Sequence, residues 1–448
     1  MYSKMYKWIL AIVFCGAVAG EGYAQEAYPQ LPPQKVDSLF LPVDQLFSLG
    51  VENSLKLRAD AIKEKLSAEQ KQTARTSRLP DLQIGLKGGV LGQPVVFQRG
   101  LSDPTYPDTP DWSQNYAVDF TQPVYQGGRI HYGIKKAGLL QEAAALQTVA
   151  DRSEIKLGLM ERYLELFSLF KQEMVLERNI EESERRLEDI RRMKREGLIT
   201  NNDVLRSEMQ LTNDRLSLTE VHNSILLLSQ QLCILLGLEE HHVLLPDTAL
   251  LYQSVELRDY DAFLCEALQN EPSLNYLRKQ TEIAQVDVKV ARAASLPGVS
   301  LYASNTLARP VSRTMADFYN NNWNIGLSVS YSLSSLYKNN HKIRENKLAV
   351  LLSKNEEDLK LQQIRVEVRQ AYLRHHEALK RVEALKLSVR QAEENYRIMQ
   401  NRYLNQLAIL TDLLDANSVR LDAELQLTSA RTQVIYTYYQ LQRVCGRL

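Results

Sequence analysis

The stretch that decides the fold is residues 323–333, which read Trp323-Asn324-Ile325-Gly326-Leu327-Ser328-Val329-Ser330-Tyr331-Ser332-Leu333. Apolar side chains alternate with small polar ones throughout, and this period of two predicts a β-strand with one apolar face. Strands of soluble sheets have about five or six residues, whereas a tilted strand that crosses a membrane needs about 9–11. Taken alone, the segment fits either environment. On the membrane reading, the lipid-facing set is Trp323, Ile325, Leu327, Val329, Tyr331 and Leu333.

Three further segments carry weaker forms of this alternation, so that four strands are predicted, at about 82–91, 113–124, 299–308 and 323–333. The strands of each pair are separated by Pro-rich or Asn-rich loops, residues 92–112 and 309–322. Four strands cannot close a barrel, and open strand edges are not tolerated in lipid. Membrane insertion therefore requires several chains, and three copies would supply a 12-stranded barrel.

The composition excludes several classes of protein. The chain has 448 residues, with 54 Lys and Arg against 54 Asp and Glu, and this neutrality argues against a nucleic-acid partner. A hydrophobic fraction of 44% excludes a disordered chain. The mean hydropathy of −0.31 argues against a bundle of transmembrane helices. It does not argue against membrane strands, because their alternating pattern cancels in any average.

The amino terminus, residues 1–24, is predicted to be a cleavable export signal. Lys4 and Lys7 precede the apolar run 8–18, and Ala24 offers a small residue at a cleavage point. The alternative, a short membrane anchor, is less well supported because the run is short for a bilayer. The remaining cysteines are odd in number and widely spaced, which is typical of neither a disulfide framework nor a zinc site.

The distribution of proline predicts long helices. All 14 prolines lie in residues 29–123 and 246–310, and none lies in 124–245 or 311–448. Each Pro-free tract is interrupted once, at 197–202 and 406–411, so each predicts a helix of about 65 residues, a turn and a returning helix of about 35. Such a helix spans roughly 100 Å, which suits a conduit across an aqueous compartment. A solid coiled-coil stalk is the alternative, but it does not explain the strands.

The chain also repeats itself. A shift of 217 residues aligns Asn53 with Asn270 and Leu79-Pro80 with Leu296-Pro297, and a shift of 209 aligns Asp203 with Asp412 and Gly237 with Gly446. A constant offset over more than 100 residues predicts a tandem duplication. The units are 25–237 and 260–448, with a linker at 238–259, and each begins with a helix (43–78 and 260–295) that ends at a Leu-Pro pair.

This order of helix, strand, strand, long helix, turn and helix, present twice after an export signal, resembles the TolC-like outer-membrane efflux family. The residues that carry the resemblance are the two Leu-Pro pairs, the strand-to-helix junction 123–129, Tyr403 and the segment 412–416. The resemblance implies a mainly α fold with β: a homotrimer with a 12-stranded barrel in the outer membrane and a coiled-coil α-helical barrel through the periplasm. It also implies docking to a periplasmic adaptor and an inner-membrane transporter.

The expected function is therefore a passive exit duct for efflux or type I secretion, with the outer membrane as its location. A periplasmic helical scaffold or adaptor without a pore is the alternative. Drugs, metal ions and polypeptides are all compatible cargo, because the pump and adaptor would select it. No nucleophile elbow, phosphate loop or metal-ligand cluster is present in the sequence, so we expect neither enzymatic activity nor a cofactor.

The candidate periplasmic gate consists of Asp412, Asp415, Asp203 and Tyr403. Asp412 and Asp415 share one helix face, and in a trimer they would form a ring of six carboxylates that favours cations. Helix capping is the alternative role, and it is favoured for Asp203. The resemblance assigns Tyr403 to the gate, and it places Ala408 where the family has an arginine.

Two further groups of residues have side chains suited to binding. The turns at Gly197-Leu198 and Gln406-Leu407 are the candidate adaptor surface, because an exposed apolar residue at a helical tip needs a partner. The pairs His241-His242 and His375-His376 are not expected to bind metal, since adjacent side chains on a helix do not face each other.

Overall fold

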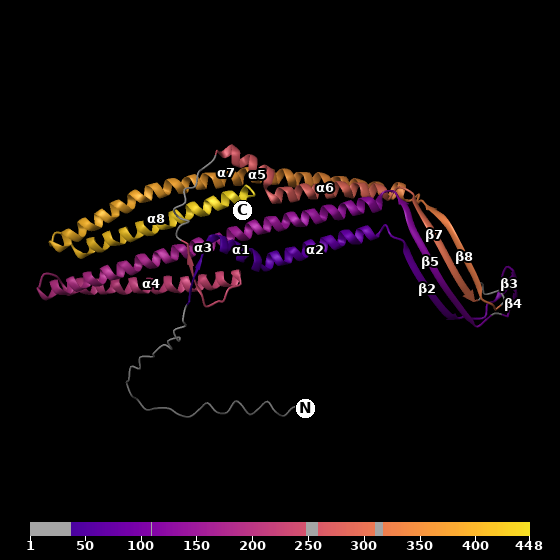
Figure 1. Cartoon of the computed structure of the whole chain (residues 1–448), viewed down its shortest axis with the longest axis horizontal. Coiled ribbons are helices and arrows are strands. Elements are labelled where there is room, and N and C mark those ends of the chain that lie inside the picture. Colours follow the sequence, from indigo (N-terminus) through magenta and orange to yellow (C-terminus); the bar gives the residue numbers. More distant parts are fainter. Residues whose placement is uncertain (1–36, 109, 248–258, 310–316) are drawn as a thin grey trace, which may run out of the picture.

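The computed structural model describes residues 37–108, 110–247, 259–309 and 317–448 (Figure 1). The predicted export signal lies outside these residues, as do half of the predicted linker and part of the second strand loop. The chain is mainly helical and elongated, with a β-sheet at one end and two helical hairpins at the other (Figure 1).

The elements of the two halves follow in the same order. The first half contains α1 (Val43–Asn53), α2 (Leu55–Thr76), β2 (Asp81–Val90), β5 (Trp112–Gln126), α3 (Arg129–Arg195) and α4 (Asn201–Leu236). The second half contains α5 (Tyr260–Asn270), α6 (Pro272–Ala293), β7 (Gly298–Arg309), β8 (Asn320–Ser330), α7 (Ser335–Leu404) and α8 (Leu410–Val444). The long helices α3 and α7 have 67 and 70 residues, as the Pro-free tracts predict.

The helix predicted at the start of each half is in fact two helices. Ser54 and Glu271 have extended backbones, and each side chain accepts a hydrogen bond from the amide of the third residue of the next helix, Leu57 and Leu274. Each break is therefore an N-cap inside an otherwise helical pattern. Pro272 at the first position of α6 was a sequence signal for the second break.

The sheet has the antiparallel order β2-β5-β7-β8, so that sequence-distant β5 and β7 are neighbours at its centre. The pairing of β5 with β7 shifts between Pro123 and Tyr125, an irregularity that accommodates a proline inside a strand. The predicted strand 323–333 is wrong at both ends, because β8 covers 320–330. Tyr331 and Leu333 follow the strand, where the amide of Ser335 bonds to the carbonyl of Ser332 and the chain turns into α7.

Two short strand pairs were not predicted. β3 (Val96–Arg99) and β4 (Ser102–Thr105) form a hairpin within the first strand loop. β1 (Ser38–Leu41) and β6 (Val243–Pro246) pair in parallel beside the helices at the middle of the molecule. Strands of four residues carry too few alternations to be recognised by periodicity.

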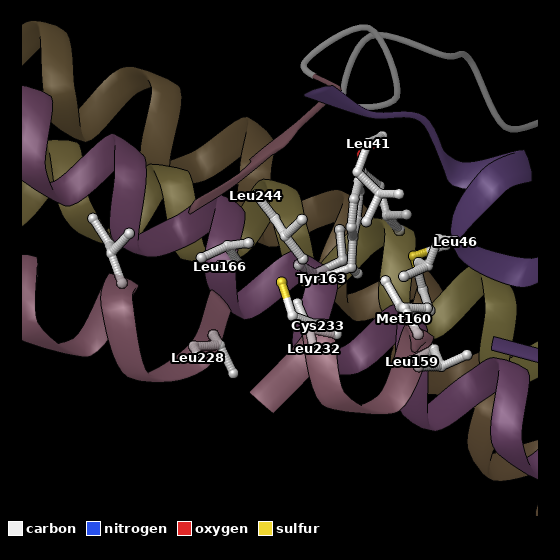
Figure 2. Packing of buried hydrophobic residues seen from close by; sticks show 14 of the residues in the cluster. Leu41, Leu46, Leu159, Met160, Tyr163, Leu166, Leu228, Leu232, Cys233 and Leu244 are labelled. Atoms are coloured by element: carbon white, nitrogen blue, oxygen red, sulfur yellow. The ribbon is translucent and has the colours of Figure 1, made fainter. Parts of the chain in front are cut away.

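The largest buried cluster lies where β1 and β6 cross α3 and α4. Figure 2 shows Leu41, Leu244 and Cys233 around Tyr163, with Leu46 and Met160 beside them. The Tyr163 hydroxyl donates to the Leu41 carbonyl at 2.7 Å and accepts from the Asp247 amide at 2.6 Å. Burial raises the pKa of Tyr163 to about 12. Each buried aliphatic side chain contributes roughly 1.5–3 kcal/mol, so this cluster fixes the short strands to the long helices.

None of the helices in the described ranges has a sufficiently long apolar stretch to cross a lipid bilayer.

Candidate functional site

Apolar side chains of all four strands lie on one face of the sheet. Residues paired across neighbouring strands point to the same face, and so do residues two apart along a strand. The pairing therefore forms rows across the sheet. Three consecutive rows, read from β2 to β8, are Leu82-Phe120-Ala303-Ile325, Ile84-Val118-Asn305-Trp323 and Leu86-Tyr116-Leu307-Asn321. The apolar face thus extends over strands that are distant in the sequence.

The opposite face is polar or small. One of its rows is Gln83-Asp119-Ser304-Asn324, in which the Ser304 hydroxyl donates to the Asp119 carboxylate at 2.6 Å. A sheet with one apolar and one polar face separates two environments. Trp323, Ile325 and Leu327 on the apolar face are 72%, 67% and 69% exposed, so no described part of the chain covers them. An exposed, largely apolar surface of this kind needs a partner outside the chain.

At the other end of the molecule, both helical hairpins end in a turn of the same kind. Gly197 and Gln406 have positive φ values of +77° and +61°, and the residue after each donates its amide five residues back, to Met193 and Arg402. This left-handed cap ends a helix abruptly and leaves the next residue at the tip. Leu198 and Leu407 are exposed there by 49% and 68%. The structure therefore places the candidate adaptor residues together at one end.

The four candidate gate residues are all near these tips, but they are not one cluster. Asp203 accepts from the Thr200 amide at 3.0 Å and from its hydroxyl at 2.7 Å, which is a cap. Asp412 accepts from the Ile409 amide at 3.4 Å, and Asp415 is exposed one turn further on. Tyr403 is buried, and burial raises its pKa. Within one chain, Asp412 and Asp415 therefore line the surface, while Tyr403 belongs to the packing below it.

A polar seam that the sequence did not reveal joins the two hairpins. We define it as Asn179 and Glu182 of α3, Asp214 of α4, and Asn417 and Arg420 of α8. Buried Asn179 donates to Asp214 at 2.8 Å and accepts from Asn417 at 2.9 Å. Arg420 donates to Glu182 at 2.6 Å and to Asn417 at 3.0 Å. These bonds hold the hairpins in register, because breaking one leaves a buried polar group without a partner.

The seam borders a hollow between the hairpins. The guanidinium of Arg420 lies over the ring of Tyr396 at 4.2 Å, and Arg186 donates to the Tyr396 hydroxyl at 3.2 Å. Glu182, Arg186, Tyr396, Tyr403 and Arg420 all line a cavity of about 530 Å³. The spacing of these polar residues along α3, α7 and α8 is that of ordinary solvated helices, so no local pattern indicates that they meet.

The two histidine pairs differ. His375 and His376 lie within α7, where His375 is buried with its Nδ1 2.9 Å from the Thr437 hydroxyl and His376 is exposed. The helix argument against metal binding holds for this pair. His241 and His242 follow the end of α4, and their ring centroids are 4.5 Å apart. The assumption that this pair lies on a helix was therefore wrong.

Comparison with known proteins gives a consistent result. Residues 264–447 match the family described as outer membrane efflux protein. None of the curated protein sequences matches the chain. Among solved structures, the chain resembles the outer-membrane channel OprN with a TM-score of 0.76 and 17% identity, covering 91% of this chain and 90% of that one.

Two other solved structures are similar over comparable lengths. The outer membrane protein VceC of Vibrio cholerae has a TM-score of 0.73 and 19% identity, with 90% of this chain and 96% of VceC covered. CusC, described in connection with transmembrane channel formation, has a TM-score of 0.77 and 15% identity, with 95% and 99% covered. The chain therefore has the fold of these proteins over nearly its full length.

Proposed function

We propose that this chain, whose residues 264–447 belong to the outer membrane efflux protein family, is one protomer of an outer-membrane exit duct. The observation that carries the proposal is the single apolar face formed in register by all four strands. In water this face would remain uncovered, which argues against a periplasmic scaffold without a pore. In the outer membrane, lipid covers the face and the polar rows face a lumen.

The duct is a homotrimer. β2 and β8 are the edge strands of the four-stranded sheet, and their unpaired backbone groups are too costly to leave in lipid. Three copies placed edge to edge, β8 of one beside β2 of the next, close a 12-stranded barrel. The helical hairpins of the three copies then form a coiled-coil barrel that continues the lumen into the periplasm. The elements of the two halves follow in the same order, which supports the proposal that the chain arose by duplication of one unit.

The protein works as a passive conduit in a tripartite efflux or type I secretion system, and not as an enzyme. The inner-membrane transporter supplies the energy and, with a periplasmic adaptor, selects the cargo. Leu198 and Leu407 contact the adaptor, because they are exposed apolar side chains at the tips of the two hairpins. Asp412 and Asp415 form the acidic constriction, which three copies repeat around the axis.

A pair of neighbouring residues tests the membrane placement of the sheet. Ile325 lies on the apolar face, and the adjacent Asn324 lies on the polar face. An arginine that faces lipid near the bilayer centre costs about 2–4 kcal/mol, whereas one in the lumen does not. We therefore expect Ile325→Arg to reduce the folded trimer in the outer-membrane fraction, and Asn324→Arg to leave it unchanged. The trimer is measured by its migration in gels before and after heating.

Two outcomes would contradict the proposal. Equal amounts of trimer for the two arginine variants would mean that the two faces of the sheet do not lie in different environments. Recovery of the wild-type protein as a monomer in the soluble periplasmic fraction would rule out the duct and favour the scaffold.

A further inference from the structure

Three side chains with metal-binding atoms converge in the turn after α4. The amide of His242 donates to the Glu239 carbonyl at 3.4 Å, which closes a turn of four residues. The Nε2 atoms of His241 and His242 lie 3.4 Å and 3.7 Å from the same carboxylate oxygen of Glu239. One ligand atom from each of the three residues lies within 4.8 Å of the others.

These separations suit a small transition-metal ion. Zinc bonds of about 2.0–2.1 Å in tetrahedral geometry place neighbouring ligand atoms roughly 3.3 Å apart. Two imidazoles and a carboxylate form a donor set that zinc, copper and nickel accept and that calcium and magnesium do not favour. His241 is half exposed and Glu239 is 74% exposed, so an ion can enter from solvent. Glu240 is engaged elsewhere, because it accepts from Gln230 at 2.9 Å.

A second observation concerns the orientation of His242. Its Nδ1 lies 3.4 Å from the carbonyl oxygen of Asp37, immediately before β1. Donation of Nδ1–H to that carbonyl leaves the Nε2 lone pair directed toward Glu239. Histidines that bind metal are oriented in this way by a carbonyl or carboxylate on their other nitrogen. The same Asp37 oxygen accepts from the Val243 amide at 3.1 Å, so the β1–β6 pairing holds it in place.

We infer that Glu239, His241 and His242 form a site for one divalent transition-metal ion of the zinc class on each chain. The three residues supply three tetrahedral positions and leave the fourth to water or to an outside ligand. The ion fastens the turn between α4 and β6, and through His242 it supports the attachment of β1 at the middle of the molecule. The site lies within one chain and does not depend on the proposed duct.

The test measures zinc binding by the full-length, tag-free protein in detergent, after treatment with a chelator. Titration calorimetry with Zn²⁺ is expected to give one ion per chain, and His241→Ala with His242→Ala is expected to weaken binding at least tenfold. Glu239→Gln should weaken it as well while leaving both rings in place. X-ray absorption of the zinc-loaded protein should show nitrogen and oxygen ligands, including imidazole.

The matched control is His222→Ala with His376→Ala, which also removes two exposed histidines. His222 lies 3.0 Å from Glu173, and this pair contains only one imidazole. The control variant should therefore bind zinc as the wild type does. Size-exclusion chromatography checks that every variant keeps the wild-type assembly. Wild-type protein that binds no stoichiometric zinc, or a 241/242 variant that binds it equally tightly, would overturn the site. Neither result would bear on the membrane placement of the sheet.

Discussion

Gly197 and Gln406 occupy the same place in the two hairpin turns, and both have a left-handed backbone. Glycine adopts this conformation without a steric penalty, whereas a residue with a Cβ is strained by about 1 kcal/mol or more. The first turn is therefore relaxed and the second is strained. The strained turn lies at the tip that we propose contacts the adaptor. Strain makes this turn easier to open, which would help it to change conformation when the adaptor binds.

We predict that Gln406→Gly makes the second turn harder to open. Relief of about 1 kcal/mol should slow hydrogen exchange of the amides around 405–409 roughly fivefold. Gly197→Ala introduces the opposite change and should accelerate exchange around 196–200 by a similar factor. Mass spectrometry of peptides from the two tips measures both effects in the free protein. Unchanged exchange in both variants would show that the positive φ values carry no strain.

In each half, a glycine with a left-handed backbone lies against an asparagine. Gly237 and Gly446 have φ values of +69° and +70° after α4 and α8. A Cβ on Gly237 would lie 2.7 Å from the side chain of Asn53, and one on Gly446 would lie 2.6 Å from the carbonyl of Asn270. The sequence shifts align Asn53 with Asn270 and Gly237 with Gly446. The contact between Asn53 and Gly237 in the first half thus recurs between their aligned counterparts, Asn270 and Gly446, in the second half, as a tandem duplication predicts.

At the scale of elements, α7 and α8 enclose a histidine that cannot be charged without cost. His375 is fully buried, its Nδ1 bonds to Thr437, and its Nε2 has no partner among the described residues. Burial, with a smaller effect of neighbouring His376, holds the pKa of His375 below its usual range. The unfolded chain therefore binds a proton that the folded chain excludes. The stability gained is complete above about pH 6.5 and is lost as the pH falls.

We expect the unfolding temperature of the wild type to decrease between pH 7.5 and pH 5.5, with His375 responsible for part of the decrease. His375→Gln removes the titrating group, so its unfolding temperature should depend less on pH over the same range. His376→Gln, a change at the exposed neighbour, should retain the wild-type dependence. Circular dichroism during heating measures all three proteins. A variant at 375 as pH-dependent as the wild type would contradict the assignment.

The elements differ in how far the sequence could predict them. The absence of proline was sufficient for α3 and α7, because tertiary packing has little reason to break a long helix that lacks breakers. The break at Ser54 could not be predicted, because serine disfavours helix only weakly and packing selects the cap. The break at Glu271 did have a local signal, because Pro272 disfavours helix for the residue before it. The end of β8 was missed because Tyr331 and Leu333 continue the alternation after the backbone has turned.

The candidate site was predictable to a similar extent. The apolar face of β8 could be read from one strand, but its continuation through β2, β5 and β7 depends on a register that no local pattern specifies. The polar seam depends on which faces of α3, α4 and α8 meet. Asn179 and Asn417 are 238 residues apart in the sequence. The helical period shows on which face of its helix each residue lies, but it does not show which residue of another helix it contacts.

At the scale of the whole molecule, the hairpin tips and the sheet lie at opposite ends (Figure 1). A duct anchored by its sheet therefore presents Leu198 and Leu407 to the periplasm. Burying two leucines contributes about 3 kcal/mol to a contact. We predict that Leu198→Asp with Leu407→Asp reduces binding to the adaptor more than tenfold, measured by copurification.

The control replaces the same two residues by methionine, which keeps the apolar surface and should keep adaptor binding. The amount of trimer must be equal in all samples, so that loss of assembly is not read as loss of contact. Intact copurification of the aspartate variant would mean that the adaptor binds elsewhere on the helices.

The final prediction concerns the proposed acidic constriction, which requires three copies of the chain to meet. Asp412 also accepts from the Ile409 amide, so an alanine would remove a helix cap together with the charge. Asparagine keeps the cap and removes the charge. We therefore expect Asp412→Asn with Asp415→Asn to weaken block of single-channel conductance by divalent cations, raising the half-blocking concentration roughly tenfold, or about 1.4 kcal/mol.

The matched control removes the same charge from exposed positions on α7, Glu356→Ala with Asp358→Ala, which are roughly 70 Å along the helix from the tip. Because block depends on local charge density, this variant should be blocked as the wild type is. Planar bilayers measure all three channels in the same salt. If both double variants lose block equally, the effect belongs to total charge. If neither does, the carboxylates at 412 and 415 cap and solvate the helix and do not line the narrowest part of the duct.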